Sequence, residues 1–138
     1  PVSGEQLKNI NMRGKCALVI EDDEIDMNIM DRRLDNVGFD VEKCYSGEDA
    51  LIKIRSSAEN YYDIVFISLD MTDKDGRRIA AEIRKMHRMD TKDLPLVAIS
   101  SGVQADEIQG CIDAGINHTL TKPFSAEDLY AVLINLLE

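Results

Sequence analysis

The sequence predicts a single domain of the α/β class, in which helices cover both faces of a parallel sheet. Three unbroken apolar runs, at residues 16–20, 64–67 and 96–99, have the composition of strands that are buried on both faces. Segments with apolar residues at helical spacing separate these runs. Strands and helices therefore alternate along the chain, which is typical of parallel sheets with right-handed crossovers.

Two weaker strands complete an expected set of five. Residues 41–44 and 118–121 mix polar and apolar side chains, which suits strands at the edges of a sheet. The strand order 2-1-3-4-5 places both mixed strands at the edges and the three apolar strands inside. This is the flavodoxin-like, doubly wound order, in which a site forms at the carboxyl ends of the strands where the winding reverses.

Five helices are expected, and each is expected to bury one apolar stripe. The stripes are Met27, Met30, Leu34 and Val37; Leu51, Ile54 and Ala58; Ile79, Ile83 and Met86; Ala105, Ile108 and Ile112; and Leu129, Val132, Leu133, Leu136 and Leu137. Ser46 and Ser125 are predicted N-caps. Gly38 and Gly115 are predicted to end two of the helices.

Length and composition favour one folded domain with a protein partner. A chain of 138 residues with 44% apolar side chains can fill one core, and we expect residues 15–138 to form it, with residues 1–14 as a linker or tail. The net charge of −10 disfavours binding to nucleic acid or to an anionic membrane surface.

No apolar run approaches the length of a membrane span, and the start of the chain has no signal-peptide core, so we expect a cytoplasmic domain without membrane contact. Cys16, Cys44 and Cys111 lack paired spacing and are predicted to be reduced packing residues.

Polar residues gather where the predicted strands end. Residues 21–24 are all acidic, residues 68–71 follow the third strand, residues 100–102 follow the fourth and residues 122–124 follow the fifth. Carboxylates beside a loop that offers a backbone carbonyl form a pocket suited to a hard cation such as Mg²⁺.

These segments resemble the receiver domain of two-component response regulators, over about residues 15–138. The resemblance rests on ALVIEDDEID, MTDKDG, the dipeptide IS at 99–100, and TKPF, each at a predicted strand end. It implies that Glu21, Asp22 and the backbone carbonyl of Asp70 bind metal. It also implies that Ser100 is the switch hydroxyl and that Lys122 holds the phosphoryl oxygens.

Three positions depart from the pattern of the family. Ser68 stands where the family has its phosphoacceptor aspartate, Thr72 where it usually has proline, and Thr119 where it usually has an aromatic switch residue. A serine hydroxyl cannot replace a carboxylate in forming an acyl phosphate. We therefore expect a naturally degenerate receiver that binds Mg²⁺ weakly or not at all, with Lys122 paired to Glu21 and Asp22.

The leading hypothesis is thus a non-enzymatic pseudo-receiver from a hybrid sensor kinase or regulator, which signals by protein contact. Its expected partner is a histidine kinase, a phosphotransfer domain, an output domain or a second copy, docked on the face formed by residues 104–138. The polar or amphipathic positions expected on this face are Asp106, Glu107, Gln109, Glu127, Asp128 and Tyr130.

Two alternatives remain open. The first is an active phosphoreceiver with Asp70 or Asp73 as a displaced acceptor, although a shift of two residues moves a carboxylate by roughly 6–7 Å along a strand. The second is a Toprim-like, metal-dependent enzyme acting on nucleic acid, suggested by Glu21 and the D-x-D at residues 73–75. The acidic charge disfavours the second alternative.

Overall fold

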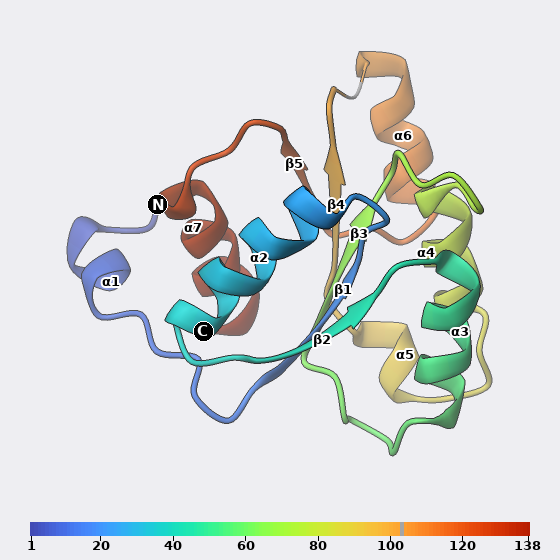
Figure 1. Cartoon of the computed structure of the whole chain (residues 1–138), viewed down its shortest axis with the longest axis horizontal. Coiled ribbons are helices and arrows are strands. Elements are labelled where there is room, and N and C mark those ends of the chain that lie inside the picture. The colour runs from blue at the N-terminus through green and yellow to red at the C-terminus, as the bar shows by residue number, and fades with distance from the viewer. Residues whose placement is uncertain (103) are drawn as a thin grey trace.

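The computed structural model, described here for residues 1–102 and 104–138, contains one five-stranded parallel sheet (Figure 1). Its strands are β1 (Cys16–Ile20), β2 (Asp40–Cys44), β3 (Ile64–Ser68), β4 (Leu96–Ser100) and β5 (His118–Thr121). Their order is β2-β1-β3-β4-β5, and every neighbouring pair is parallel. The predicted fold class, strand order and edge strands are confirmed.

The described part of the chain forms seven helices instead of the expected five. They are α1 (Gly4–Lys8), α2 (Glu24–Asn36), α3 (Gly47–Ser56), α4 (Gly76–Arg84), α5 (Asp90–Asp93), α6 (Ala105–Asp113) and α7 (Ala126–Leu137). The two unexpected helices, α1 and α5, are five and four residues long, too short to carry an apolar stripe. Both predicted serine N-caps are present, with Ser46 capping α3 and Ser125 capping α7.

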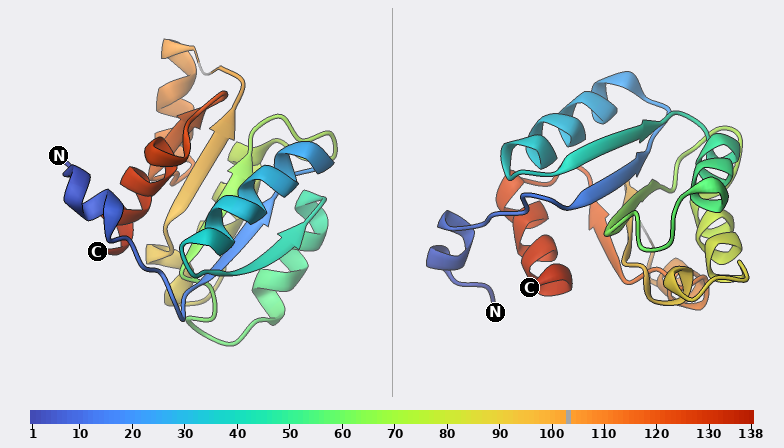
Figure 2. Two further views of the ribbon diagram at one scale, coloured as in Figure 1. Left: turned by 60° about the vertical axis from the view of Figure 1, so that its left-hand side comes forward. Right: turned by 90° about the horizontal axis from the view of Figure 1, so that it is seen from below.

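The helices form two layers on opposite faces of the sheet (Figure 2). One core cluster joins the sheet to α3 and α4 and includes Val65 and Ile67 of β3. The other joins the sheet to α2 and α7 and includes Ile64 and Phe66. Because successive side chains of a strand point to opposite faces, the apolar residues 64–67 of β3 supply both cores.

The first segment of the chain contributes to the second core. Met12 is fully buried, and its N–H donates to the carbonyl of Val37. This approach depends on Gly38, which has φ of +108° and where an added Cβ would lie 2.7 Å from the backbone nitrogen of Arg13. The α1 helix contacts α7. Part of the segment expected to be a linker or tail therefore packs against the domain.

The expected stripe on α6 is wrong. Ile108 and Ile112 are 50% and 58% exposed, whereas Cys111 is buried and Ala114 packs against the first core. Cys111 lies about 100° around the helix from Ile112, so the helix is rotated to place small side chains against the sheet. Spacing identifies an apolar stripe, but it does not determine whether that stripe faces the core.

Two smaller expectations also concern burial. Ala58 lies beyond the end of α3 and is exposed, so it does not belong to the core stripe of that helix. The cysteines are free, and burial raises the pKa of the Cys16 thiol to about 11.

Within the described residues, no helix combines the length and the apolar character that a bilayer crossing requires.

Candidate functional site

The parallel strands bring the predicted site residues to one edge of the sheet. The register pairs Ser68 with Ile99 and Ser100 with Thr121, so the ends of β3, β4 and β5 are adjacent. Glu21 follows β1 and is only 4% exposed, while Ser68 and Ser100 are each 2% exposed. These residues form a cluster of buried polar groups, and Glu21 also lines a pocket at this edge of the sheet.

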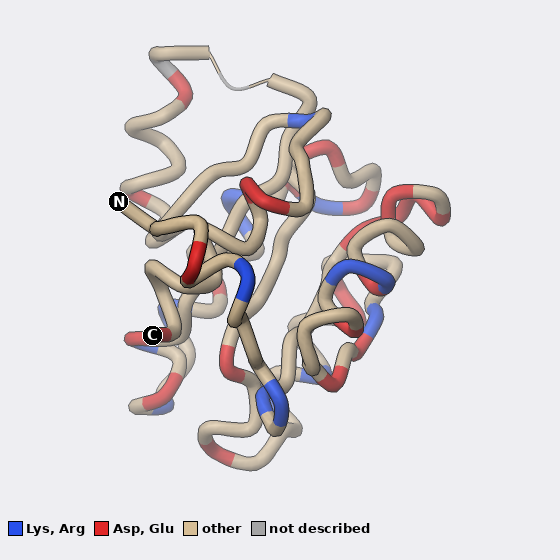
Figure 3. Tube along the Cα trace, turned by 90° about the vertical axis from the view of Figure 1, so that its left-hand side faces the viewer, with Lys and Arg blue, Asp and Glu red and all other residues tan. Residues whose placement is uncertain are grey.

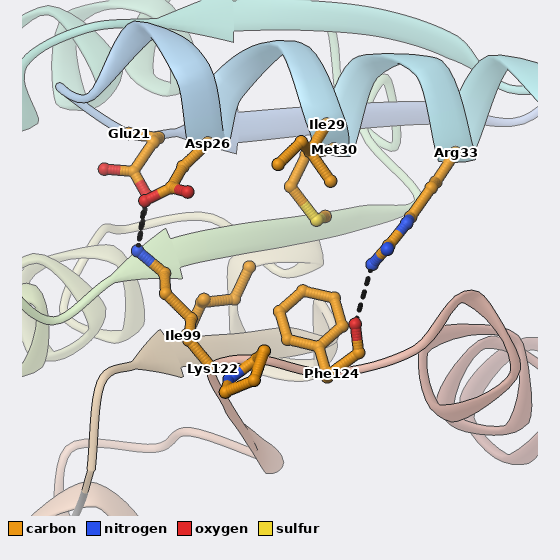
Figure 4. Close-up of a pocket in the computed structure, with 9 residues that line it drawn as sticks. Glu21, Asp26, Ile29, Met30, Arg33, Ile99, Lys122 and Phe124 are labelled. Carbon is orange, nitrogen blue, oxygen red and sulfur yellow. Dashed lines mark hydrogen bonds and ion pairs between the residues drawn. The ribbon is translucent and has the colours of Figure 1, made fainter.

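Lys122 is held by two carboxylates. Its Nζ lies 2.7 Å from Asp26 Oδ2 and 3.2 Å from Glu21 Oε1 (Figure 4). Burial alone would lower the pKa of Lys122, but the hydrogen bond from Lys122 to Asp26 and the charge of Glu21 outweigh it and raise that pKa above its usual value. The expected pairing with Glu21 is present, while Asp26 takes the place expected for Asp22.

The neighbouring acids have separate structural partners. Glu21 Oε2 accepts a hydrogen bond from the N–H of Asp23 at 3.2 Å. Asp23 in turn caps α2 by accepting a hydrogen bond from the N–H of Asp26 at 2.9 Å. The α2 helix thus begins beside the pocket and carries Asp26 toward Lys122.

Asp22 contacts the loop that follows β3. Its Oδ2 accepts hydrogen bonds from both the N–H and the hydroxyl of Thr72, each at 2.9 Å. These residues are 50 positions apart in the sequence, and no periodic pattern signals their pairing. The contact fixes the end of β1 to this loop.

Two buried serines end β3 and β4. Ser68 Oγ accepts a hydrogen bond from the N–H of Asp70 at 3.3 Å, whereas Ser100 Oγ is buried without a hydrogen-bond partner in the described structure. A Cβ added at Gly76 would lie 2.6 Å from the Ser68 carbonyl oxygen, so the start of α4 packs directly on the end of β3. Position 76 therefore has no room for a side chain.

The other acids of the β3–α4 loop point to different partners. Asp70 Oδ2 accepts from the N–H and the hydroxyl of Ser101, at 3.2 and 3.3 Å. Asp73 accepts from the N–H groups of Gly47 and Glu48, at 3.0 and 3.2 Å, and so caps α3. The hydrogen bond from Gly47 is the main cause of the lowered pKa of Asp73.

Asp75 of the same loop caps α4 and pairs with Arg77, whose hydrogen bond lowers the pKa of Asp75.

Thr119 lies half-buried on β5, in a hollow of about 280 Å³ between β5 and α7.

A second hollow of about 180 Å³ lies between α2 and the segment after β5, next to the ion pair of Lys122 (Figure 4). Ile29, Met30 and Phe124 form much of its apolar lining. Arg33 closes one end, because its Nη1 donates to the carbonyl of Phe124 at 2.9 Å and its guanidinium lies 5.5 Å from the centre of that ring. Sequence analysis missed this role of Arg33.

The residues expected to bind metal do not fit Mg²⁺ in this arrangement. Among the described residues, no group of three His, Cys, Asp or Glu side chains is placed to hold a metal ion. Glu21 is directed to Lys122, Asp22 is directed to Thr72, and position 68 offers a hydroxyl instead of a carboxylate. Hard cations are held by several oxygen ligands that converge on one point.

Comparison with known proteins agrees with the strand order and the motifs. The model of the family described as "Response regulator receiver domain" matches residues 17–134. The chain is a response regulator receiver domain. It is 32% identical over 120 residues to hybrid signal transduction histidine kinase L of Dictyostelium discoideum, and 28% identical over 120 residues to the peroxide stress-activated histidine kinase mak2 of Schizosaccharomyces pombe.

These alignments cover 85% and 86% of the receiver domain but only 7% and 5% of the two kinases. The domain thus spans a small part of the curated relatives that it matches.

Solved structures show the same fold. Chemotaxis protein CheY4 of Vibrio cholerae has a TM-score of 0.81 at 21% identity, with 89% of the receiver domain and 98% of CheY4 covered. The receiver domain of sensor histidine kinase PA1611 from Pseudomonas aeruginosa has a TM-score of 0.78 at 23% identity, with 89% and 97% covered. That structure contains a magnesium ion coordinated in its active-site cleft.

Proposed function

We propose that this receiver domain is a pseudo-receiver, which signals by protein contact without forming an aspartyl phosphate. The observation that carries the proposal is the state of the pocket: a buried serine ends β3, and Lys122 is neutralised by Glu21 and Asp26. Acyl-phosphate chemistry requires a carboxylate nucleophile, and serine becomes a nucleophile only with a base beside it. The domain is then a cytoplasmic, non-enzymatic module.

The contacts of the other acids support this proposal over a displaced acceptor. Asp70 is held by Ser101, and Asp73 is held at the start of α3. Neither carboxylate is directed to Lys122, whose Nζ contacts Glu21 and Asp26.

The Toprim-like alternative also loses support. Its D-x-D pair, Asp73 and Asp75, caps two different helices. Acidic and basic residues are interspersed along the trace in Figure 3, and the net charge is −10. A nucleic-acid enzyme would instead present clustered positive charge to the phosphate backbone.

We further propose that the partner docks on the face of α6, β5 and α7, within residues 104–138. Ile108 and Ile112 give this face an exposed apolar centre, and the hollow beside Thr119 lies on the same part of the fold. The partner classes are a histidine kinase, a phosphotransfer domain, an output domain or a second copy, in a hybrid sensor kinase or regulator.

Some of the polar positions expected on this face have other roles. Glu107 pairs with Arg77 and accepts from the N–H of Gln104 at the start of α6. The hydroxyl of Tyr130 donates to the carbonyl of Arg33 on α2, while the side chain of Asp106 lies outside the described residues. Substitution of Ile108 and Ile112 therefore tests docking more directly than reversal of the charge at Glu107, because Glu107 also contacts Arg77.

Phosphorylation tests the first proposal. The domain is incubated with acetyl phosphate and Mg²⁺ and its intact mass is measured, alongside a receiver that has an aspartate at the acceptor position as a check on the donor. We expect no added phosphoryl group on this domain and one on the control. A stable phosphoryl group mapped to Asp70 or Asp73 would establish the displaced-acceptor alternative instead.

Docking is tested with serine substitutions at Ile108 and Ile112, matched by Ile52→Ser on α3, where the native isoleucine is 53% exposed. Calorimetry measures binding to histidine kinase and phosphotransfer domains of the same organism, and sedimentation measures self-association. We expect the α6 variants to lose the interaction and the α3 variant to keep it. Equal effects of all three substitutions would argue against this face.

A further inference from the structure

Asp22 has a partner that depends on the residue type at position 72. The N–H and the hydroxyl of Thr72 donate to the same carboxylate oxygen, Asp22 Oδ2, at 2.9 Å each. Proline has no N–H, and neither proline nor an aliphatic residue has a hydroxyl. Threonine and serine are therefore the residues that supply both donors with a short side chain.

We propose that Thr72 takes the place of a divalent cation at Asp22. Its two donors direct their positive ends at the carboxylate, as a metal ion would direct its charge, and they join the loops after β1 and β3 without metal. A cation that binds Asp22 through Oδ2 competes with both Thr72 donors for that oxygen. This inference rests on the contacts of the loop and is independent of whether any aspartate is phosphorylated.

The neighbouring acids also bind donors from the protein itself. Glu21 is paired with Lys122, and Asp70 accepts two hydrogen bonds from Ser101. The β3–α4 loop is thus fixed on one side to the end of β1, through Asp22, and on the other side to the end of β4, through Ser101.

The expected size of the effect follows from the nature of the hydrogen bonds. Both donors bind a charged acceptor, and the loss of one such bond corresponds to about a tenfold change in an equilibrium constant. Thr72 is exposed, so water partly replaces a lost donor, and the change in the binding constant should stay near tenfold and not exceed it greatly. Removing the hydroxyl should therefore strengthen cation binding at Asp22 by roughly tenfold.

The test titrates the intact domain with Mn²⁺ alone, which accepts the same oxygen ligands as Mg²⁺ and is detected by electron paramagnetic resonance. Thr72→Val removes the hydroxyl, Thr72→Ala removes it with a smaller side chain, and Thr72→Ser keeps both donors as the matched control. We expect weak binding to the native domain and to the serine variant, and about tenfold stronger binding to the valine and alanine variants. Adding Asp22→Asn to the valine variant should abolish the gain.

Circular dichroism establishes that each variant is folded, and the alanine variant provides the comparison if valine disturbs the loop. The proposal is overturned if the folded variants bind Mn²⁺ no more tightly than the native domain, including no binding by any of them. It is also overturned if Asp22→Asn leaves the gain intact, or if the native domain already binds Mn²⁺ as tightly as the valine variant.

Discussion

The loops at the amino ends of the strands, here called the amino edge, and those at the carboxyl ends, the carboxyl edge, are held together by different kinds of contact. At the amino edge, two arginines bind backbone carbonyls of several segments. At the carboxyl edge, most of the contacts described above join a carboxylate to donors of another segment, as between Asp22 and Thr72. A backbone carbonyl is present whatever the residue, whereas a side-chain pair requires both partners. The amino edge therefore tolerates sequence change around the arginines, and the carboxyl edge is where substitutions alter the chemistry.

Arg88 shows how much the amino edge depends on one side chain. Its guanidinium donates to the carbonyls of Ile54, Ser57 and Ala58 at 2.6, 3.0 and 3.1 Å, and it pairs with Asp90 at 2.8 Å. These contacts fix the segment after α3 to the segment after α4. Arg84 acts similarly on Gly115 and Thr91, ahead of β5 and β4.

The largest expected effect is at Arg88. Arg88→Ala should lower the free energy of unfolding by about 3 kcal/mol, because it leaves two half-buried carbonyls, those of Ile54 and Ser57, and the carboxylate of Asp90 without their donor. Lys85→Ala, at an exposed position nearby, should change it by less than about 0.5 kcal/mol. Urea denaturation followed by circular dichroism measures both. If the two variants are equally stable, the contrast between the edges is wrong.

At the carboxyl edge, Lys122→Met should cost about 2 kcal/mol, since it leaves the buried Glu21 without its cation while Lys122 itself is 25% exposed and partly screened. Adding Glu21→Gln should recover part of the loss. Because the pKa of Lys122 is raised, its contribution is complete below the ordinary value of 10.5 and is lost as the pH rises through the raised value. Unfolding measured between pH 7 and pH 12 should show this loss, and a loss of the same contribution near neutral pH would contradict it.

A smaller effect is expected at Asp73, which joins the β3–α4 loop to α3. Asp73→Ala should cost about 1 kcal/mol, as is typical for the loss of a helix cap. The pKa of Asp73 is lowered, so its contribution is present above the ordinary value of 3.8 and is lost as the pH falls through the lowered value. Hydrogen exchange should locate the change at the start of α3, and uniform exchange across the domain would argue against a capping role.

The smallest effect is expected at Ser68. Its hydroxyl makes one long contact, at 3.3 Å, so Ser68→Ala should change stability by less than about 1 kcal/mol and should leave partner binding unchanged. Thermal unfolding and the calorimetric docking assay measure the two quantities. A large loss of docking with intact folding would mean that the pocket still controls the signalling surface.

The sequence predicts the sheet well because each strand has its own signal. Unbroken apolar runs mark β1, β3 and β4 as inner strands, and mixed runs mark β2 and β5 as edge strands, a pattern that the observed order satisfies. The same strand ends bring Glu21, Ser68, Ser100 and Lys122 to one edge, because parallel strands end together.

The contacts of the site were harder to predict. The Asp22–Thr72 and Asp73–Gly47 hydrogen bonds join residues 50 and 26 positions apart, and such pairs leave no periodic pattern in a single sequence. The pairing of Lys122 with Asp26 depends on where α2 begins, and the exposure of Ile108 depends on the rotation of α6. These are properties of packing and of loop course, which residue spacing does not specify.

The contact between α1 and α7 places the two ends of the domain on the same side of the molecule (Figure 2). Domains with neighbouring termini commonly accept circular permutation, because a short connector can close the chain. A permuted domain would keep the pocket intact while presenting α1 and α7 as one continuous, covalently closed surface.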